Sequence, residues 1–439
     1  MKYISIIGLE THVELNTKSK MFCGCSADYF GQEPNTHTCP VCLGLPGALP
    51  VPNQQAIDWV VMIALALGCE INTFSKFDRK NYFYPDLPKS YQISQYDLPF
   101  GEHGSMKLSN GRTVGITRVH MEEDTGKLIH ATVKDENVSL IDFNRSSVPL
   151  VEIVTEPDFH DALEVKEYLQ RLQQIVRYLG VSNADMEKGN MRLEPNISLS
   201  TDPKKLPPYK VEVKNINSFR FVEKAINYEV KRHEQILDSG KNPPQETRGW
   251  NEQKNITVSQ RVKEEANDYR YFPEPDIPPI TLSQSQIEKI KSQIPELPDA
   301  KQKRFEKEYA LSAIDAEILT REKDMADYFE ETVTVGKIHE VTPKQIANTI
   351  INKKTDIATT LPAQLIVQIK QEAKVEEIDE TELENIIREV LENNQKAVQD
   401  YKSGKETVIM FLLGQTMRQL GKKVDTQIVK EKLEKQLAS

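Results

Sequence analysis

The sequence predicts an α+β fold for residues 1–293, followed by two all-helical parts over residues 294–375 and 376–439. Strand-like segments in which polar and apolar residues alternate are the first observation behind this prediction. Amphipathic helical segments lie between these strands, and from about Ser283 onward the sequence becomes charged, helical and poor in aromatic residues. Alternating polarity is typical of antiparallel sheets with one open face, so we expect such a sheet, with helices, in the first domain.

The first strand, Ile4 to Leu15, has one apolar face and one acidic face. Successive side chains of a strand point to opposite faces, so Glu10, His12 and Glu14 share one of them. The apolar face can join a core, while the acidic face can hold a metal.

The same arrangement recurs at residues 114–124, 191–200 and 209–216. In the first of these segments His120 and Glu122 share one face, whereas Glu123 falls on the other. The other two segments also set charged residues opposite apolar ones, and these charged residues include Arg192, Glu194, Lys210, Glu212 and Lys214. Mg²⁺ takes oxygen ligands that histidine can join, and Arg and Lys can meet phosphate charge. The pattern indicates a metal–nucleotide site, with a solvated strand face as the alternative.

Four of the five cysteines form two close pairs, Cys23 with Cys25 and Cys39 with Cys42. Four thiolates in two pairs suit a tetrahedral zinc ion, and such a closed site is structural because no position is left for a substrate. We expect a zinc loop over residues 23–42, with four reduced, half-buried thiols as the alternative. The fifth cysteine, Cys69, is expected in the core.

Three amphipathic helices are expected in the first domain, over residues 54–67, 161–179 and 218–237, and Asn53 can cap the first of them. Residues 77–99 are dense in aromatic residues, proline and charge, which fits either a loop that stacks on a base or a rigid structural loop. Glu152 is the only charge in the strand from Pro149 to Val154. A carboxylate there is costly unless it is paired or bound to a metal.

The tail is expected to hold three helices, Thr381–Glu392, Thr407–Leu420 and Gln427–Leu437, the first opened by a capping box of Thr381 with Glu384. The tail carries no pattern of catalytic residues, so we expect it to serve as a scaffold or to contact RNA. The chain has no P-loop, dinucleotide-binding or nucleophile-elbow motif, so nucleotide chemistry requires a site of another kind.

Composition excludes some classes of function. A formal net charge of −10 argues against a protein that binds nucleic acid mainly through a general basic surface. The longest apolar run, Trp59 to Leu67, is too short to span a bilayer, and the chain enters its first strand without a charged and apolar leader. We therefore expect a cytoplasmic protein with no membrane association and only local RNA contacts.

Several longer stretches carry a family resemblance. They include I-G-L-E-T-H-V-E-L at Ile7, S-K-M-F-C at Ser19, F-D-R-K-N-Y-F-Y-P-D at Phe77, H-M-E-E-D-T-G-K at His120, N-R-S-S-V-P-L-V-E-I-V-T-E-P-D at Asn144 and V-K-N-I-N-S-F at Val213. Together they closely resemble the B subunit of the glutamyl/aspartyl-tRNA amidotransferase, in the family's order. The final helical part also resembles the family's tail domain, with F-L-L-G-Q-T-M at Phe411.

The resemblance implies a tRNA-dependent kinase that uses ATP and Mg²⁺. Such a protein phosphorylates the side chain of glutamate on tRNA(Gln) or aspartate on tRNA(Asn), and ammonia from a glutaminase A subunit then displaces the phosphate. A small C subunit completes the implied heterotrimer. The implied fold of the first domain is a cradle like that of glutamine synthetase.

The resemblance also assigns residues to the site. It places the magnesium ligands at Glu10, His12, Glu123, Glu194 and Glu212, and it places Glu10, His12 and Glu123 at the reacting centre. Phosphate contacts are expected from Lys80, Arg192, Lys210 and Lys214. The family usually has aspartate where this chain has Glu194, followed here by Pro195, and only some members carry the zinc cysteines.

Two other functions fit the same residues. A zinc-stabilised tRNA-binding scaffold would keep the fold but would not bind ATP. A ligase that acts on free glutamate would use the sheet but would leave the helical tail unexplained.

Overall fold

The computed structural model describes residues 2–202, 205–262, 269–373, 379–421 and 424–438. It contains two compact units, Met1–Arg304 with Thr320–Lys323, and Phe305–Leu319 with Asp324–Ser439. The predicted boundary between residues 375 and 376 lies outside the described residues.

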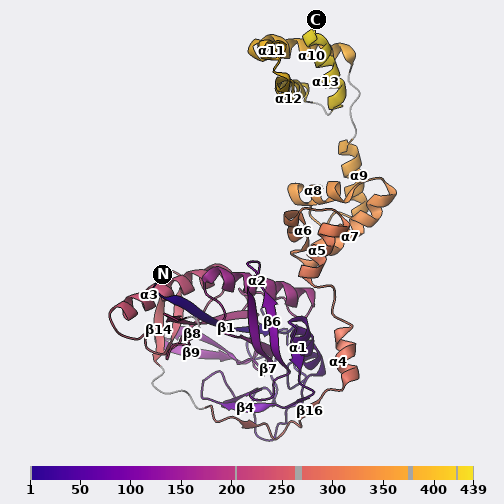
Figure 1. Cartoon of the computed structure of the whole chain (residues 1–439). Helices are drawn as coiled ribbons and strands as arrows, with labels where there is room; N and C mark the ends of the chain where they lie inside the picture. The colour runs from indigo at the N-terminus through magenta and orange to yellow at the C-terminus, as the bar shows by residue number, and fades with distance from the viewer. Residues whose placement is uncertain (1, 203–204, 263–268, 374–378, 422–423, 439) are drawn as a thin grey trace. The chain divides into compact units, whose positions relative to one another are not determined.

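A nine-stranded sheet forms the centre of the first unit (Figure 1). Its strands lie in the order β14 (Ile256–Val262), β13 (Glu246–Asn251), β12 (Val211–Lys214), β11 (Met191–Ser200), β1 (Ile4–Glu14), β10 (Pro149–Thr155), β7 (Thr113–Glu123), β6 (Gly101–Lys107) and β2 (Glu70–Ile71). All neighbours are antiparallel except β12 and β13, which are parallel. The expected mixed fold with an antiparallel sheet is confirmed.

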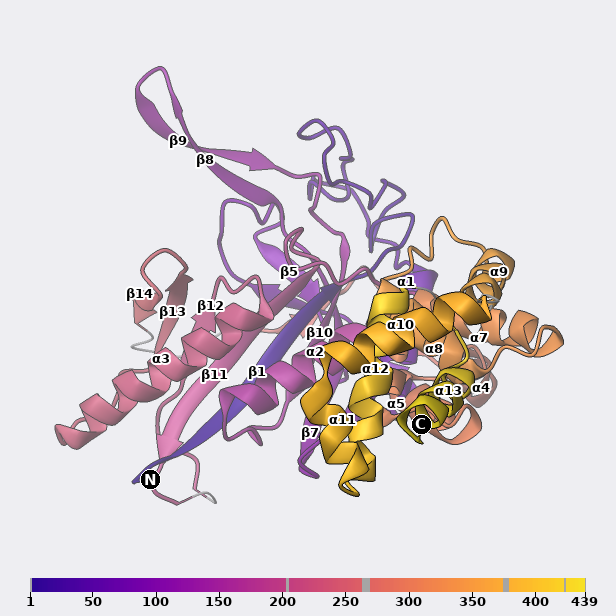
Figure 2. The same cartoon turned by 90° about the horizontal axis from the view of Figure 1, so that it is seen from above.

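Smaller sheets surround this centre. One contains β15 (Phe272–Pro273), β4 (Asp78–Asn81) and β5 (Tyr91–Ser94), and another pairs β16 (Ile280–Thr281) with β3 (Phe74–Ser75). The aromatic segment 77–99 therefore contributes two strands. A separate hairpin of β8 (Lys127–Val133) and β9 (Glu136–Asp142) projects away from the large sheet (Figure 2).

Four helices accompany the large sheet: α1 (Gln54–Ala66), α2 (Ala162–Tyr178), α3 (Phe219–Asp238) and α4 (Gln284–Lys291). Their buried residues form one hydrophobic core with the apolar face of the sheet, to which β1 contributes Ile7, Leu9 and Val13. In Figure 1, α2 and α3 lie over this face. The three predicted helices agree with α1, α2 and α3 to within one residue at each end. Because the helices cover the apolar face, the acidic face is left for binding.

The second unit is helical, and the division between the two units falls within α5. Its helices are α5 (Pro298–Glu308), α6 (Ala313–Thr320), α7 (Lys323–Ile338), α8 (Pro343–Lys353), α9 (Pro362–Ala373), α10 (Glu380–Asn393), α11 (Gln395–Lys402), α12 (Ile409–Leu420) and α13 (Thr426–Ala438), with a 3₁₀ turn, η1 (Glu406–Val408), before α12. Buried residues form one hydrophobic cluster between residues 305 and 369 and a second between residues 383 and 437.

Two details of the tail prediction are wrong. The described residues of the tail form four α-helices rather than three, because α11 begins directly after Asn394. Asp379, not Thr381, caps α10, and its carboxylate accepts hydrogen bonds from the N–H groups of Thr381 and Glu382. Thr381 instead lies inside the first turn, where Asp379 satisfies its N–H.

No helix within the described part of the chain is both long enough and apolar enough to cross a membrane.

Replacing Asn53 with alanine tests how α1 is anchored. The Asn53 side chain accepts hydrogen bonds from the N–H groups of Gln55 and Ala56 and donates to the Ser19 carbonyl at 3.0 Å. We expect Asn53→Ala to lower the free energy of unfolding of the first unit by about 1–2 kcal/mol. Denaturant titration measures this loss, and Asn227→Ala on the exposed face of α3 is the matched control. Equal denaturation midpoints for Asn53→Ala and Asn227→Ala would contradict the anchoring role of Asn53.

Candidate active site

Five neighbouring strands contribute acidic or histidine side chains to the uncovered face of the large sheet. These side chains are His120 and Glu122 (β7), Glu152 (β10), Glu10 and His12 (β1), Glu194 (β11) and Glu212 (β12). Glu10 lies opposite Glu194 in the strand register, and His12 lies opposite Glu152. Segments far apart in sequence thus meet on one face of the sheet.

His12, Glu122 and Glu152 form the first of two clusters, with ligand atoms that all lie within 4.8 Å of one another. His12 Nε2 lies 3.7 Å from Glu122 and 3.6 Å from Glu152. His120 Nε2 lies 3.0 Å from Glu152 on the other side. Glu122 is buried and accepts a hydrogen bond of 2.8 Å from the Ser94 hydroxyl. β5 therefore fixes one wall of this cluster.

Glu10, Glu194 and Glu212 form the second cluster, again with ligand atoms within 4.8 Å of one another. Lys214 Nζ lies 2.8 Å from Glu194 and 3.1 Å from Glu212, so its ammonium group bridges two of the three carboxylates. The Asn196 amide donates a hydrogen bond of 2.9 Å to Glu10. Pro195 does not prevent Glu194 from joining the cluster.

Burial and neighbouring charges together set the protonation of this face. Burial and the charge of Glu152 raise the pKa of Glu10. Burial alone would lower the pKa of His12, but Glu152 and other carboxylates raise it to about 9. Burial alone would raise the pKa of Glu122, but the charge of Lys80 lowers it to about 2. The carboxylates therefore depend on nearby positive charge.

The donor set fits a divalent cation such as Mg²⁺. Carboxylate oxygens dominate it, imidazole nitrogens join them, and a bound cation would relieve the repulsion that raises the pKa of Glu10. The Lys214 ammonium already bridges two of these carboxylates, as a metal would. The described residues also leave the Nδ1 atoms of His12 and His120 buried without a hydrogen-bond partner.

The predicted phosphate-binding cations lie in different surroundings. Lys80 Nζ is 3.5 Å from Glu122 at the edge of the first cluster. Lys210 is exposed, and its charge opposes the rise in the pKa of Glu10. Arg192 is held by Asp124 and by Glu14, the latter at 3.1 Å. Lys80 and Lys210 thus lie near different clusters, whereas Arg192 already pairs with two carboxylates.

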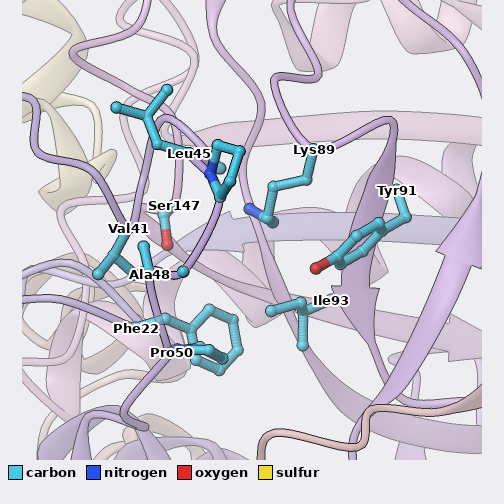
Figure 3. Close-up of a pocket in the computed structure, with 12 residues that line it drawn as sticks. Phe22, Val41, Leu45, Ala48, Pro50, Lys89, Tyr91, Ile93 and Ser147 are labelled. Atoms are coloured by element: carbon cyan, nitrogen blue, oxygen red, sulfur yellow. The ribbon is translucent and has the colours of Figure 1, made fainter.

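Glu123 points away from both clusters, on the other side of β7. Its carboxylate lies 2.8 Å from Lys89 Nζ and accepts a hydrogen bond of 2.9 Å from the Ile93 N–H. Lys89 lines a pocket of about 210 Å³, and Figure 3 shows Lys89 and Tyr91 facing Val41 and Leu45 across it. The two clusters found among the described residues do not include Glu123.

Glu122 and Glu152 are the cluster members absent from the sequence-based ligand set. The alternation of β7 already placed Glu122 beside His120, while the family resemblance pointed to Glu123. Glu152 was identified as a costly charge among apolar neighbours, but its partners lie on other strands. The period-two pattern was the signal that could have identified Glu122.

The four paired cysteines also meet. The sulfur atoms of Cys23, Cys25, Cys39 and Cys42 lie within 4.8 Å of one another, and all five cysteines are free thiols. Cys69 is buried in the hydrophobic core, as expected. A cluster of four sulfur ligands fits a structural metal site.

Comparison with known proteins finds matches over most of the chain. The family model described as the GatB/GatE catalytic domain matches residues 5–288, and the GatB domain model matches residues 308–437. The chain is 46% identical to the B subunit of the aspartyl/glutamyl-tRNA(Asn/Gln) amidotransferase of Thermomicrobium roseum, covering 100% of this chain and 99% of the relative. The proteins of the same name from Dehalococcoides mccartyi (99% of each chain) and Carboxydothermus hydrogenoformans (100% and 99%) are 45% and 42% identical.

The matched regions contain both carboxylate clusters, all four paired cysteines and the helical tail. The chain therefore belongs to the GatB family, the B subunits of aspartyl/glutamyl-tRNA(Asn/Gln) amidotransferases.

Proposed function

We propose that the chain supplies the kinase site of a tRNA-dependent amidotransferase. Its substrates are glutamate on tRNA(Gln) or aspartate on tRNA(Asn), as the names of its relatives indicate. The observation that best supports this proposal is the pair of neighbouring carboxylate clusters on one face of the sheet, because such a face suits a metal nucleotide. The proposed cradle resembles the fold of glutamine synthetase, which forms a similar γ-glutamyl phosphate.

The proposed reaction has two steps. A carboxylate oxygen of the aminoacyl side chain attacks the γ-phosphorus of ATP, the bond to the β-phosphate oxygen breaks, and ADP leaves. Ammonia then attacks the acyl carbon, phosphate leaves, and the nitrogen loses a proton to give the amide. Bound Mg²⁺ would supply positive charge for the triphosphate. The residues that would hold it are those of the two clusters, His12 with Glu122 and Glu152, and Glu10 with Glu194 and Glu212.

The chain's cations and its pocket have separate roles in this proposal. Lys80 and Lys210, which lie near different clusters, would supply positive charge to the phosphates, and Lys214 and Arg192 would add to it from beside their carboxylates. Glu123 and Lys89 lie beside the pocket near residues 41–50, which we assign to ammonia delivery. A glutaminase A subunit would supply the ammonia, a small C subunit would complete the heterotrimer, and the complex would work in the cytoplasm without membrane contact.

A scaffold function is the second candidate, and one observation favours it. Lys214 already bridges Glu194 and Glu212, so its ammonium could replace a metal permanently. The chain would then present tRNA without binding ATP. Whether the complex splits ATP decides between the two functions.

Phosphate release tests the kinase function. The chain assembled with its A and C subunits should release phosphate from ATP only with Mg²⁺ and mischarged Glu-tRNA(Gln) or Asp-tRNA(Asn), because the acyl acceptor is the aminoacyl side chain. Labelled γ-phosphate measures this release, and Gln-tRNA(Gln) is the matched control. Release at background level with both mischarged tRNAs would favour the scaffold, whereas activity with free glutamate would favour a ligase that needs no tRNA.

Neighbouring glutamates of β7 provide a test of the metal ligands. Glu122→Gln should weaken Mn²⁺ binding by about tenfold or more, because an amide is a poor ligand for a hard cation. Glu123→Gln should leave Mn²⁺ affinity unchanged, since Glu123 pairs with Lys89 on the other side of the strand. Electron paramagnetic resonance of Mn²⁺ measures both. The opposite ranking would restore Glu123 to the ligand set that the family resemblance implies.

Metal analysis tests the cysteine cluster. The purified chain should carry about one zinc ion, and Cys39→Ser should lose it because a closed tetrahedral site needs all four ligands. Cys69→Ser is the matched control, since Cys69 lies in the core outside the cluster and its loss should leave zinc in place. If freshly reduced wild-type protein carries no zinc, the four cysteines are packed thiols and not metal ligands.

A further inference from the structure

A buried hydroxyl outside both clusters holds one of the carboxylates in place. The Thr247 hydroxyl of β13 donates a hydrogen bond of 3.0 Å to Glu212 Oε2. Both residues are buried, and the parallel pairing of β12 with β13 places Thr247 opposite Glu212. Thr247 lies on the next strand outward from the cluster.

This bond fixes the rotation of the Glu212 carboxylate. Oε2 is held by Thr247, while Oε1 lies 3.1 Å from the Lys214 ammonium that also contacts Glu194. With Oε2 held in this way, the carboxylate keeps an orientation in which Oε1 faces the space beside Glu194. A hydrogen bond to an ionised acceptor in a buried setting is also stronger than one between neutral groups.

A charge network on the opposite face of β13 holds Thr247 itself. The residues on either side of it, Glu246 and Arg248, pair with each other at 2.9 Å. Arg248 also lies 3.1 Å from Glu229 of α3, which is fully buried. Arg232 of the same helix lies 3.2 Å from Glu246. The strand is thereby fixed at both neighbours of Thr247, so its hydroxyl has little freedom to leave Glu212.

We propose that Thr247 is a positioning residue that orients Glu212 as a ligand of the second carboxylate cluster. This inference rests on the proposed metal–nucleotide function of that cluster. Groups that orient metal ligands from behind commonly change metal affinity by about 10–100-fold when they are removed.

Mn²⁺ binding to the assembled complex tests the inference. Thr247→Val should weaken binding by about tenfold, and Thr247→Ser, which keeps the hydroxyl, should restore it. Thr332→Val is the matched control, because Thr332 is a buried threonine of α7 whose hydroxyl donates to the Tyr328 carbonyl. Thr247→Ala removes the same hydroxyl and keeps the test available if the valine variant does not fold.

A double-mutant cycle with Glu212→Gln separates positioning from general destabilisation. If Thr247 acts through Glu212, then adding Thr247→Val to Glu212→Gln should cause no further loss of Mn²⁺ affinity. An additional loss, or wild-type affinity in Thr247→Val and Thr247→Ala, would overturn the role of Thr247 while leaving the metal site intact. Wild-type affinity in Glu212→Gln itself would overturn the metal site, and this inference with it.

Discussion

Several carboxylates on one sheltered sheet face cannot all remain ionised unless positive charge lies beside them, and this constraint organises the first unit. Glu152 is buried between His12 and His120, Glu122 has Lys80 at its edge, and Lys214 bridges the second cluster. Each interaction offsets a desolvation cost that the apolar side of the same strands does not have. A face built in this way would favour a bound cation, in agreement with the proposed metal–nucleotide site.

The two-residue period of the strands determines which residues reach this face. In β7 it separates Glu122, which meets His12, from Glu123, which meets Lys89. The adjacent glutamates therefore point to different spaces: Glu122 to the cluster with His12 and Glu152, and Glu123 to Lys89, which lines the pocket near residues 41–50. A slip of one residue in the pairing of β7 would exchange them and would also turn Met121 out of the core.

Local patterns were readable from the sequence, whereas pairings between distant strands were not. The helix cap at Asn53, the alternation of β1 and the cysteine spacing all depend on residues close together in the chain, and the structure agrees with each. No sequence pattern indicates the contact of Thr247 with Glu212, because this contact depends on a parallel pairing of strands across the intervening helix α3. The cap of α10 was misassigned by two residues, because Asp379 and Thr381 are both good capping residues and only the backbone distinguishes them.

The cysteine loop and the acidic face are coupled through the end of β1. The Tyr29 hydroxyl, four residues beyond Cys25, donates a hydrogen bond of 3.1 Å to Glu14, which also accepts one of 2.7 Å from Asn190. Glu14 is the second acidic residue that β1 places on the face carrying Glu10 and His12. A metal bound by the four cysteines would order the loop and would therefore also restrain the end of the strand that carries Glu10 and His12. On this argument the four cysteines stabilise the site from outside it, although they contribute no ligand to either carboxylate cluster.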